Sequence, residues 1–186
     1  MELHVIKREQ IKKSESNRIR REGNIPAVVY FQGKESYAIT VNGTEFSNHM
    51  RTVISGRLST TICHLKDENG KTQRALIKDI QYEITTYKIQ HLDFEVLSDN
   101  VMINLNVPIE CSGVVDCVGV KLGGVLRQVI RSLRIRCFPK DIPTSFVVDV
   151  KTLGQNETKK LSDLVIPHTI KPFGNLNEVA IIIAKR

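Results

Sequence analysis

His91 and Asp93 stand two residues apart in the predicted strand Ile89–Leu97, so their side chains point to the same face. An imidazole beside a carboxylate can move protons in acid–base catalysis, and RNA cleavage is one such reaction. No serine or cysteine nucleophile is recognisably placed for such a reaction, which makes catalysis the weaker interpretation. Because phosphates repel a carboxylate, an aspartate on an RNA-binding surface must accept hydrogen bonds from base amino groups or orient a cation such as Arg20.

A basic segment precedes this strand by about seventy residues. Between Lys7 and Arg21 the chain has seven Lys or Arg against two Glu, and the apolar run Pro26–Tyr30 follows. A local charge of +5 beside a strand that ends in an aromatic residue is typical of a surface that holds phosphates and presents side chains to bases. The alternative is a surface helix whose charges serve solubility alone.

The composition of the whole chain favours a polyanionic partner. The 186 residues are 41% apolar and 25% charged, with a formal net charge of +7. This is the balance of a folded soluble protein whose partner is nucleic acid or an anionic membrane surface. No apolar run approaches the roughly 18–20 residues of a membrane span, and the start of the chain lacks a secretory pattern. We therefore expect a cytoplasmic protein with no membrane partner.

The four cysteines do not predict a metal site. The closest pair has five residues between its members, whereas common zinc sites have two to four. The expectation is free thiols, no metal and no cofactor.

The elements that must position these residues are mostly strands. A helix over residues 15–22, capped by Ser14 and stopped by Gly23, carries Arg18, Arg20 and Arg21. Arg18 and Arg21 are neighbours at a spacing of three, while Arg20 points elsewhere. A second short helix is expected near residues 45–50. The predicted strands are Ala27–Phe31, Tyr37–Val41, Leu58–Leu65, Arg74–Lys78 and Ile89–Leu97.

The turn Asp67–Gly70 predicts a hairpin, with Asn69 and Gly70 at positive backbone angles. Five or six short strands joined by such turns favour a closed or nearly closed barrel over a parallel sheet. Ser98–Asn100 reads as a boundary, which divides the chain into domains 1–98 and 99–186. The fold class expected is therefore mainly β with few short helices: an N-terminal β-barrel and a second β-rich domain.

In the second domain, alternation predicts strands Val101–Val107, Leu133–Cys137 and Phe146–Val150. Arg134 and Arg136 share one face, which predicts either a second polyanion contact or a solvated strand face. The glycine-rich segment 113–124 fits neither a dinucleotide fingerprint nor a phosphate loop, so a turn or bulge is expected there.

Several motifs, in this order and spacing, resemble one family. They are Arg8-Glu9, Arg18–Tyr30, Lys78–Gln81, His91–Phe94, Val118–Leu126, Cys137–Pro143 and Asp149-Val150. Together they are similar to the bacterial large-subunit ribosomal protein family that binds 5S rRNA, the L twenty-five family, in its long two-domain general stress protein (Ctc) form. The resemblance covers almost the whole chain. One departure is Phe31, where the family commonly has glycine.

The resemblance implies an N-terminal barrel bound to an internal-loop helix of 5S rRNA and a second domain against neighbouring parts of the large ribosomal subunit. It implies no enzymatic activity. A monomer is expected away from the ribosome, since no heptad pattern offers a partner surface. The alternative is a stress-linked factor, associated with the ribosome conditionally, whose C-terminal domain binds a protein. The candidate RNA-binding residues are Arg8, Lys13, Arg18, Arg20, Arg21, Tyr30, Gln81, His91 and Asp93.

Overall fold

The computed structural model describes residues 1–8, 12–31 and 34–185. The chain forms two compact units, Met1–Val101 and Met102–Arg186. The sequence predicts the boundary slightly earlier, at Ser98–Asn100. Each unit is described by itself.

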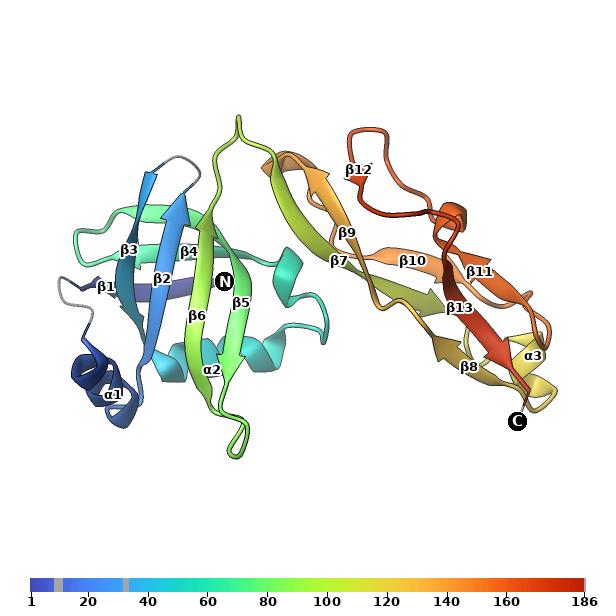
Figure 1. The fold of residues 1–186 in the computed structure, drawn as a ribbon, viewed down its shortest axis with the longest axis horizontal. Coiled ribbons are helices and arrows are strands. Elements are labelled where there is room, and N and C mark those ends of the chain that lie inside the picture. Colours follow the sequence, from blue (N-terminus) through green and yellow to red (C-terminus); the bar gives the residue numbers. More distant parts are fainter. Residues whose placement is uncertain (9–11, 32–33, 186) are drawn as a thin grey trace. The chain divides into compact units, whose positions relative to one another are not determined.

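The first unit is a closed six-stranded barrel (Figure 1). Its strands follow the order β1-β3-β2-β6-β5-β4, and the pairs β1–β4 and β2–β6 are parallel, while the other four are antiparallel. The strands are β1 (Glu2–Lys7), β2 (Ile25–Phe31), β3 (Lys34–Val41), β4 (Ile62–Asp67), β5 (Thr72–Tyr82) and β6 (Ile89–Val96). The predicted barrel is thus confirmed, and β1 is a strand that the sequence analysis does not predict.

Alternation along each strand builds the barrel core. Leu3, Val29, Leu92 and Phe94 point inward and are fully buried, while their strand neighbours point outward. Each such side chain stabilises the fold by about 1.5–3 kcal/mol. The core therefore fixes the backbone of the strands, and with it the positions of the outward side chains.

The helix α1 (Lys13–Arg21) packs on the outside of the barrel through Ile19, which is 5% exposed. The predicted cap at Ser14 is wrong. The helix begins at Lys13, two residues earlier than predicted, and Lys12 stands at the cap position with no side-chain cap. Gly23 has φ of +81°, which confirms the predicted left-handed stop.

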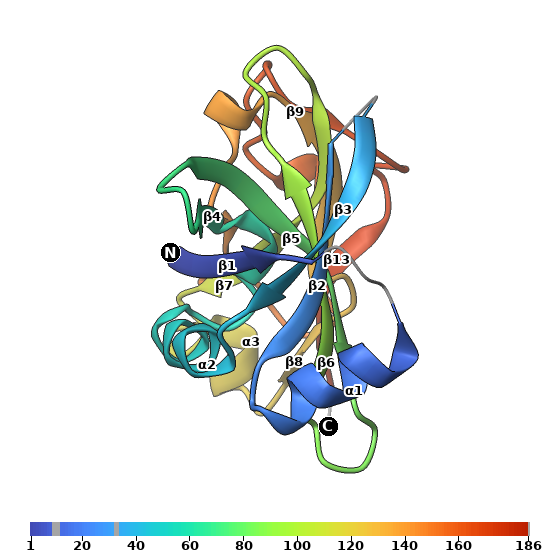
Figure 2. The same cartoon turned by 90° about the vertical axis from the view of Figure 1, so that its left-hand side faces the viewer.

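The second helix, α2 (Gly43–Thr52), lies across one end of the barrel (Figures 1 and 2). Phe46 of this helix is fully buried in the barrel core. Asn42 caps the helix, because its side-chain oxygen accepts from the backbone N–H groups of Thr44 and Glu45 at 2.9 and 3.2 Å.

Two local predictions in the barrel need correction. The segment Leu58–Thr60 is a short 3-10 helix, so the predicted strand there begins at Ile62. In the hairpin turn, Gly70 has a positive φ of +75° but Asn69 does not. The turn therefore needs a positive φ at Gly70 and not at Asn69. The Gly70 N–H closes the turn by donating to the Asp67 carbonyl at 2.9 Å.

The second unit contains two small sheets, with strand orders β10-β7-β9-β12 and β11-β13-β8. The strands are β7 (Ile103–Ser112), β8 (Val125–Gln128), β9 (Ser132–Cys137), β10 (Phe146–Asp149), β11 (Thr158–Lys160), β12 (Lys171–Pro172) and β13 (Val179–Ala184). The predicted strands correspond to β7, β9 and β10. Short helices are α3 (Val118–Lys121), η2 (Pro139–Asp141) and η3 (Leu161–Asp163). Since α3 lies within segment 113–124, that segment holds a helical turn as well as loops.

The four cysteines are free thiols; Cys63, Cys117 and Cys137 are buried and Cys111 is partly exposed. In the described part of the chain, no group of three or more His, Cys, Asp and Glu side chains is placed to hold a metal ion. No described helix is long and apolar enough to span a membrane.

Candidate nucleic-acid interface

The candidate interface is the outer face of three adjacent strands, β2, β6 and β5, together with helix α1. Strand β6 is central, because it pairs with β2 on one side and β5 on the other. Leu92 and Phe94 point into the core, so His91 and Asp93 point outward from the same strand. The fully buried side chains of Leu92 and Phe94 fix the backbone that carries His91 and Asp93.

His91 and Asp93 contact each other, as their shared face predicts. The His91 Nδ1 lies 2.7 Å from Asp93 Oδ1, and the side chains are 21% and 33% exposed. Gln81 is the cross-strand partner of His91, and Asp79 is the partner of Asp93. The structure therefore brings Gln81 onto the predicted face.

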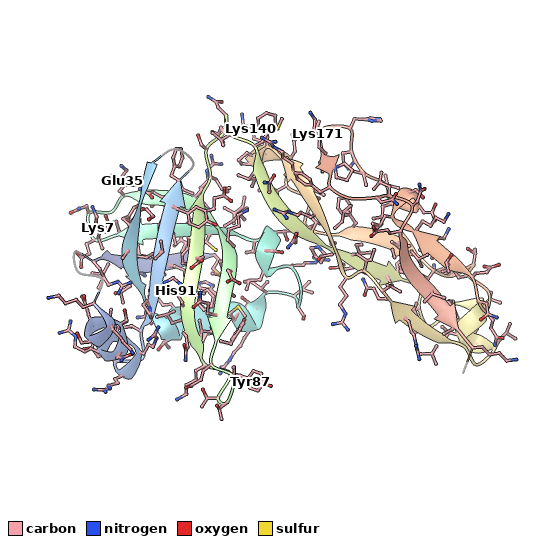
Figure 3. All side chains as sticks on the ribbon, viewed as in Figure 1. Lys7, Glu35, Tyr87, His91, Lys140 and Lys171 are labelled. Atoms are coloured by element: carbon pink, nitrogen blue, oxygen red, sulfur yellow. The ribbon has the colours of Figure 1, made fainter. Side chains whose placement is uncertain are left out.

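Arg20 reaches this face from α1. Its Nε donates to the Gln90 carbonyl at 3.1 Å, and Nη1 donates to Asn17 Oδ1 at 3.1 Å. Arg20 is therefore bonded to the backbone of the residue that immediately precedes His91, which Figure 3 labels. Two hydrogen bonds hold the guanidinium in one orientation and leave other N–H groups for a ligand.

Tyr30 lies on the neighbouring strand, in register with Glu95 of β6. Burial raises the pKa of Tyr30 to about 12, with further contributions from Glu95, Asp93 and Asp79. The phenol is therefore a neutral hydrogen-bond donor at any physiological pH. Glu95 is itself 8% exposed and forms an ion pair with Lys78 at 2.7 Å.

The candidate residues predicted from the sequence do not include Lys78, Asp79 or Glu95, although the motif Lys78–Gln81 covers the first two. A β-bulge between Ile77 and Asp79 displaces Lys78 from simple alternation, so a two-residue period cannot place its side chain. Glu95 alternates with Phe94 in the sequence, which is a readable signal that it shares the outward face with Asp93. Lys78 and Glu95 add an ion pair to this face, and Asp79 adds a carboxylate opposite Asp93.

Arg8 is hydrogen-bonded to the backbone of the barrel strand β3. Its backbone N–H donates to the Ala38 carbonyl at 2.9 Å, and its Nε donates to the Ile39 carbonyl at 3.1 Å. The pKa of Arg8 is lowered, mainly by burial of the guanidinium. The nearby Glu15 partly opposes this shift, and Arg20 adds to it. Arg8 and Arg20 are thus close enough to interact electrostatically. Glu9, which follows Arg8 in the resembling motif, lies outside the described residues.

The remaining basic residues, Lys13, Arg18 and Arg21, lie exposed on α1. Arg18 forms an ion pair with Glu22 at 3.6 Å across one helical turn. Such exposed pairs contribute little to stability, so the side chain can exchange Glu22 for another anion. The structure does not bring these three residues against the β6 face by a hydrogen bond or ion pair within the described part of the chain.

Comparisons with known proteins cover both units. Residues 3–94 match the model of the Ribosomal L25p family, and residues 102–186 match that of the C-terminal domain of ribosomal protein TL5. The large ribosomal subunit protein bL25 of Chlamydia trachomatis serovar L2b is 51% identical over 186 residues, which is 100% of both chains. The chain belongs to the ribosomal L25p family. Proteins of the same name from Chlamydia abortus and Chlamydia pneumoniae are each 50% identical over 186 residues.

Family membership confirms the resemblance read from the ordered motifs. The family models describe ribosomal proteins, a structural and non-enzymatic class, which agrees with the interpretation that His91 and Asp93 do not catalyse a reaction. A binding role for the pair in this L25p-family chain stays a prediction.

The second unit of this L25p-family member has a basic strand face of its own. Arg134 and Arg136 alternate with buried Leu133 and Ile135 on β9, so both cations point outward as predicted. Lys171 of β12 is in register with Arg136, which adds a cation that the sequence does not reveal. Arg134 also lies 5.6 Å from the centre of the Phe173 ring. Polyanion binding by this face stays a prediction.

Proposed function

We propose that this chain is a structural component of the large ribosomal subunit, located in the cytoplasm on the ribosome, and that it binds 5S rRNA. The outer face of β2, β6 and β5 reads the RNA, and the arginines and lysines of α1 hold its phosphates. The ribosomal role is supported by the names of relatives about 50% identical over the full chain. The 5S rRNA target comes from the resemblance of the ordered motifs.

One observation carries the proposal. Arg20, from a helix on the outside of the barrel, is hydrogen-bonded at 3.1 Å to the strand that presents His91 and Asp93. A cation able to contact phosphates or a guanine edge is therefore held on the strand that also presents a carboxylate able to accept from base amino groups. A surface evolved merely for solubility has no need for this combination of donors and acceptors on a rigid strand.

The shape of RNA explains why this face suits a distorted helix. A regular A-form helix hides its base edges in a deep, narrow groove that side chains cannot read. Side chains fixed on a barrel lose little conformational entropy when they bind, but they cannot extend far into such a groove. An internal loop with a widened groove presents base edges within their reach.

Gel-shift binding to 5S rRNA at several salt concentrations, with tRNA as competitor, tests the proposal. The test variant is Arg20→Ala with Asp93→Ala, which leaves the net charge unchanged. The matched control is Arg51→Ala with Asp116→Ala, two exposed residues that are not among the candidate RNA-binding residues. We expect the wild type and the control to bind 5S rRNA tightly in the presence of tRNA, and the test variant to lose this specific binding.

Binding that tRNA abolishes in the wild type would reduce the basic face to a general polyanion surface. Specific binding that survives in the test variant would move the RNA site away from β6, with the arginine face of β9 as the next surface to examine. Circular dichroism of each variant checks that the fold is retained.

A further inference from the structure

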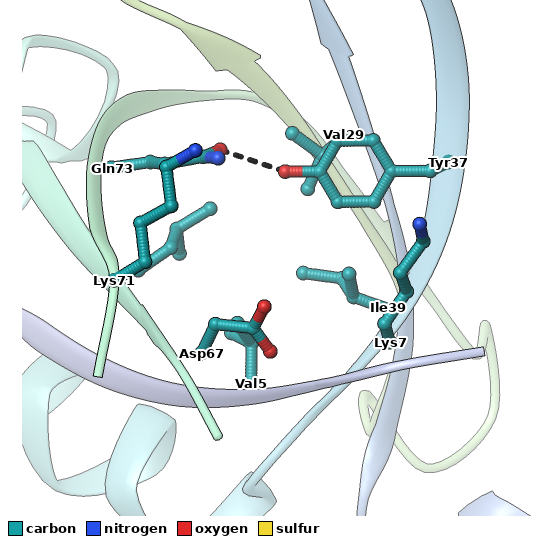
Figure 4. Close-up of a pocket in the computed structure, with 9 residues that line it drawn as sticks. Val5, Lys7, Val29, Tyr37, Ile39, Asp67, Lys71 and Gln73 are labelled. Carbon is teal, nitrogen blue, oxygen red and sulfur yellow. Dashed lines mark hydrogen bonds between the residues drawn. The ribbon is translucent and has the colours of Figure 1, made fainter. Parts of the chain in front are cut away.

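A cavity of about 200 Å³ lies at the end of the barrel opposite α2 (Figure 4). Its floor consists of the core residues Val5, Val29 and Ile39, which are at most 7% exposed. Its rim is formed where β1 and β4 end and β5 begins. The cavity therefore combines an apolar interior with polar strand ends, and it uses none of the residues assigned above to the RNA-binding face.

The polar groups at the rim are of several kinds. Tyr37 Oη donates to Gln73 Oε1 at 2.7 Å, so the Nε2 of the same amide is a donor. Asp67 supplies a carboxylate whose Oδ1 also accepts from the Glu68 N–H at 2.9 Å, and Lys7 and Lys71 supply ammonium donors from opposite sides of the opening (Figure 4). The Lys7 Nζ lies 5.7 Å from the centre of the Tyr37 ring.

The size of the cavity limits the ligand. Pockets for drug-sized molecules occupy about 300–1,000 Å³, so a cavity of about 200 Å³ suits a single ring system. An apolar floor and an aromatic wall favour a flat ring, and two lysines against one aspartate favour a ring attached to a phosphate.

The donors and acceptors select among flat rings. A guanine base offers adjacent N–H donors on one edge, which a carboxylate can accept together, and two acceptors, O6 and N7, on the other. Lysine contacts to O6 and N7 are among the commonest specific base contacts. Adenine presents an amino donor in place of O6, so it would place that donor against an ammonium or amide donor.

We propose that the barrel-end cavity binds a single unpaired guanine base through Asp67, Gln73 and the two lysines. The base belongs either to a free guanine nucleotide or to an unpaired position in RNA, since both present the same ring and phosphate. The site is independent of 5S rRNA binding by the outer strand face, and each can fail without the other.

Isothermal titration calorimetry of the full chain tests the site with four probes: GMP, AMP, and the pentanucleotides UUGUU and UUAUU. The test variant is Asp67→Asn, which replaces an acceptor by a group that includes a donor. The matched control is Glu68→Gln, the exposed neighbour that does not line the cavity. Gln73→Leu provides a second test variant, and thermal melting checks that each protein is folded.

We expect guanine probes to bind at least about tenfold tighter than adenine probes, and Asp67→Asn to remove this preference, while Glu68→Gln retains it. Binding of GMP supports a free-nucleotide source. Binding of UUGUU without binding of GMP supports an RNA source. Equal affinity for guanine and adenine probes, an unchanged preference in both folded test variants, or no binding of any probe at millimolar concentration overturns the proposal.

Discussion

His91 Nδ1 and Asp93 Oδ1 lie 2.7 Å apart on the same outward face of β6. The contact places one ring nitrogen of the imidazole against one carboxylate oxygen of Asp93. Two side chains fixed by each other and by a buried backbone can discriminate between bases with a small entropic cost.

Replacement of Asp93 by alanine should weaken specific 5S rRNA binding by roughly 1–3 kcal/mol, because an acceptor for base amino groups is lost. The slope of log affinity against log salt concentration should barely change, since a carboxylate releases no counterions from phosphates. Filter binding at four salt concentrations measures both quantities. A large change of slope would contradict the assignment of Asp93 to base contacts.

Replacement of Lys13 by alanine should have the opposite profile. Lys13 is exposed at the start of α1, where we propose that its ammonium contacts phosphates and not base edges. The salt slope should fall by about one, with little loss of discrimination between 5S rRNA and tRNA. Lys12→Ala should behave alike. Loss of discrimination without a change of slope would show that α1 reads bases.

Asn42→Ala should destabilise the protein by about 1 kcal/mol, because two backbone N–H groups at the start of α2 lose their acceptor. Ser14→Ala is the informative comparison. Since Ser14 lies inside α1 and does not cap it, its replacement should change the free energy of unfolding little. Urea unfolding of both variants measures the difference, and equal losses would contradict the observed cap positions.

Tyr87→Gly should stabilise the protein by about 0.5–1 kcal/mol. Tyr87 has φ of +54°, a strained conformation for a residue with a side chain, and its ring is 79% exposed, so little packing is lost. Tyr82→Gly, in strand β5, should instead destabilise the protein. Thermal melting compares the two variants, and a lower melting temperature for Tyr87→Gly would refute the relief of strain.

Cys63 should make stability fall at alkaline pH. Burial raises the pKa of this thiol to about 12, whereas an unfolded thiol ionises near pH 9. The unfolded state therefore loses the proton first, and stability declines as the pH rises from about 9 towards 12. In Cys63→Ala the decline between pH 9 and 11 should be smaller.

At pH 8, the partly exposed Cys111 should react with a thiol reagent before Cys63 does.

The barrel and the outward pair on β6 were predictable because they rest on local periodicity. Residues two positions apart in a strand share a face, as His91 and Asp93 do. Gly23 predicts the end of α1 because glycine readily adopts the positive φ that is found there. The contact of Arg20 with Gln90 was not predictable, because it joins residues 70 positions apart. Pairings between distant segments leave no local pattern in one sequence.

Strand β1 shows the same limit in part. Leu3 and Val5 alternate with polar residues, so a strand was readable there, but its pairing with β3 and β4 was not. In the second unit, β11 and β12 have three and two residues, too few for any period to stand out. Pro108 lies in β7 in register with Ser132 of β9, and the pairing of β7 with β10 begins one residue later, at Ile109. The proline thus stands just outside the second ladder, as its missing N–H favours.

The parallel pairing of β1 with β4 and of β2 with β6 has a consequence for the order of events during synthesis. In a growing chain, β1 lacks its second neighbour until β4 has left the ribosome, and the barrel cannot close until β6 follows and pairs with β2 and β5. Contacts between such distant segments form slowly. The strand face that we propose reads RNA therefore appears late, once nearly 100 residues have emerged, and the basic segment of α1 is synthesised well before it.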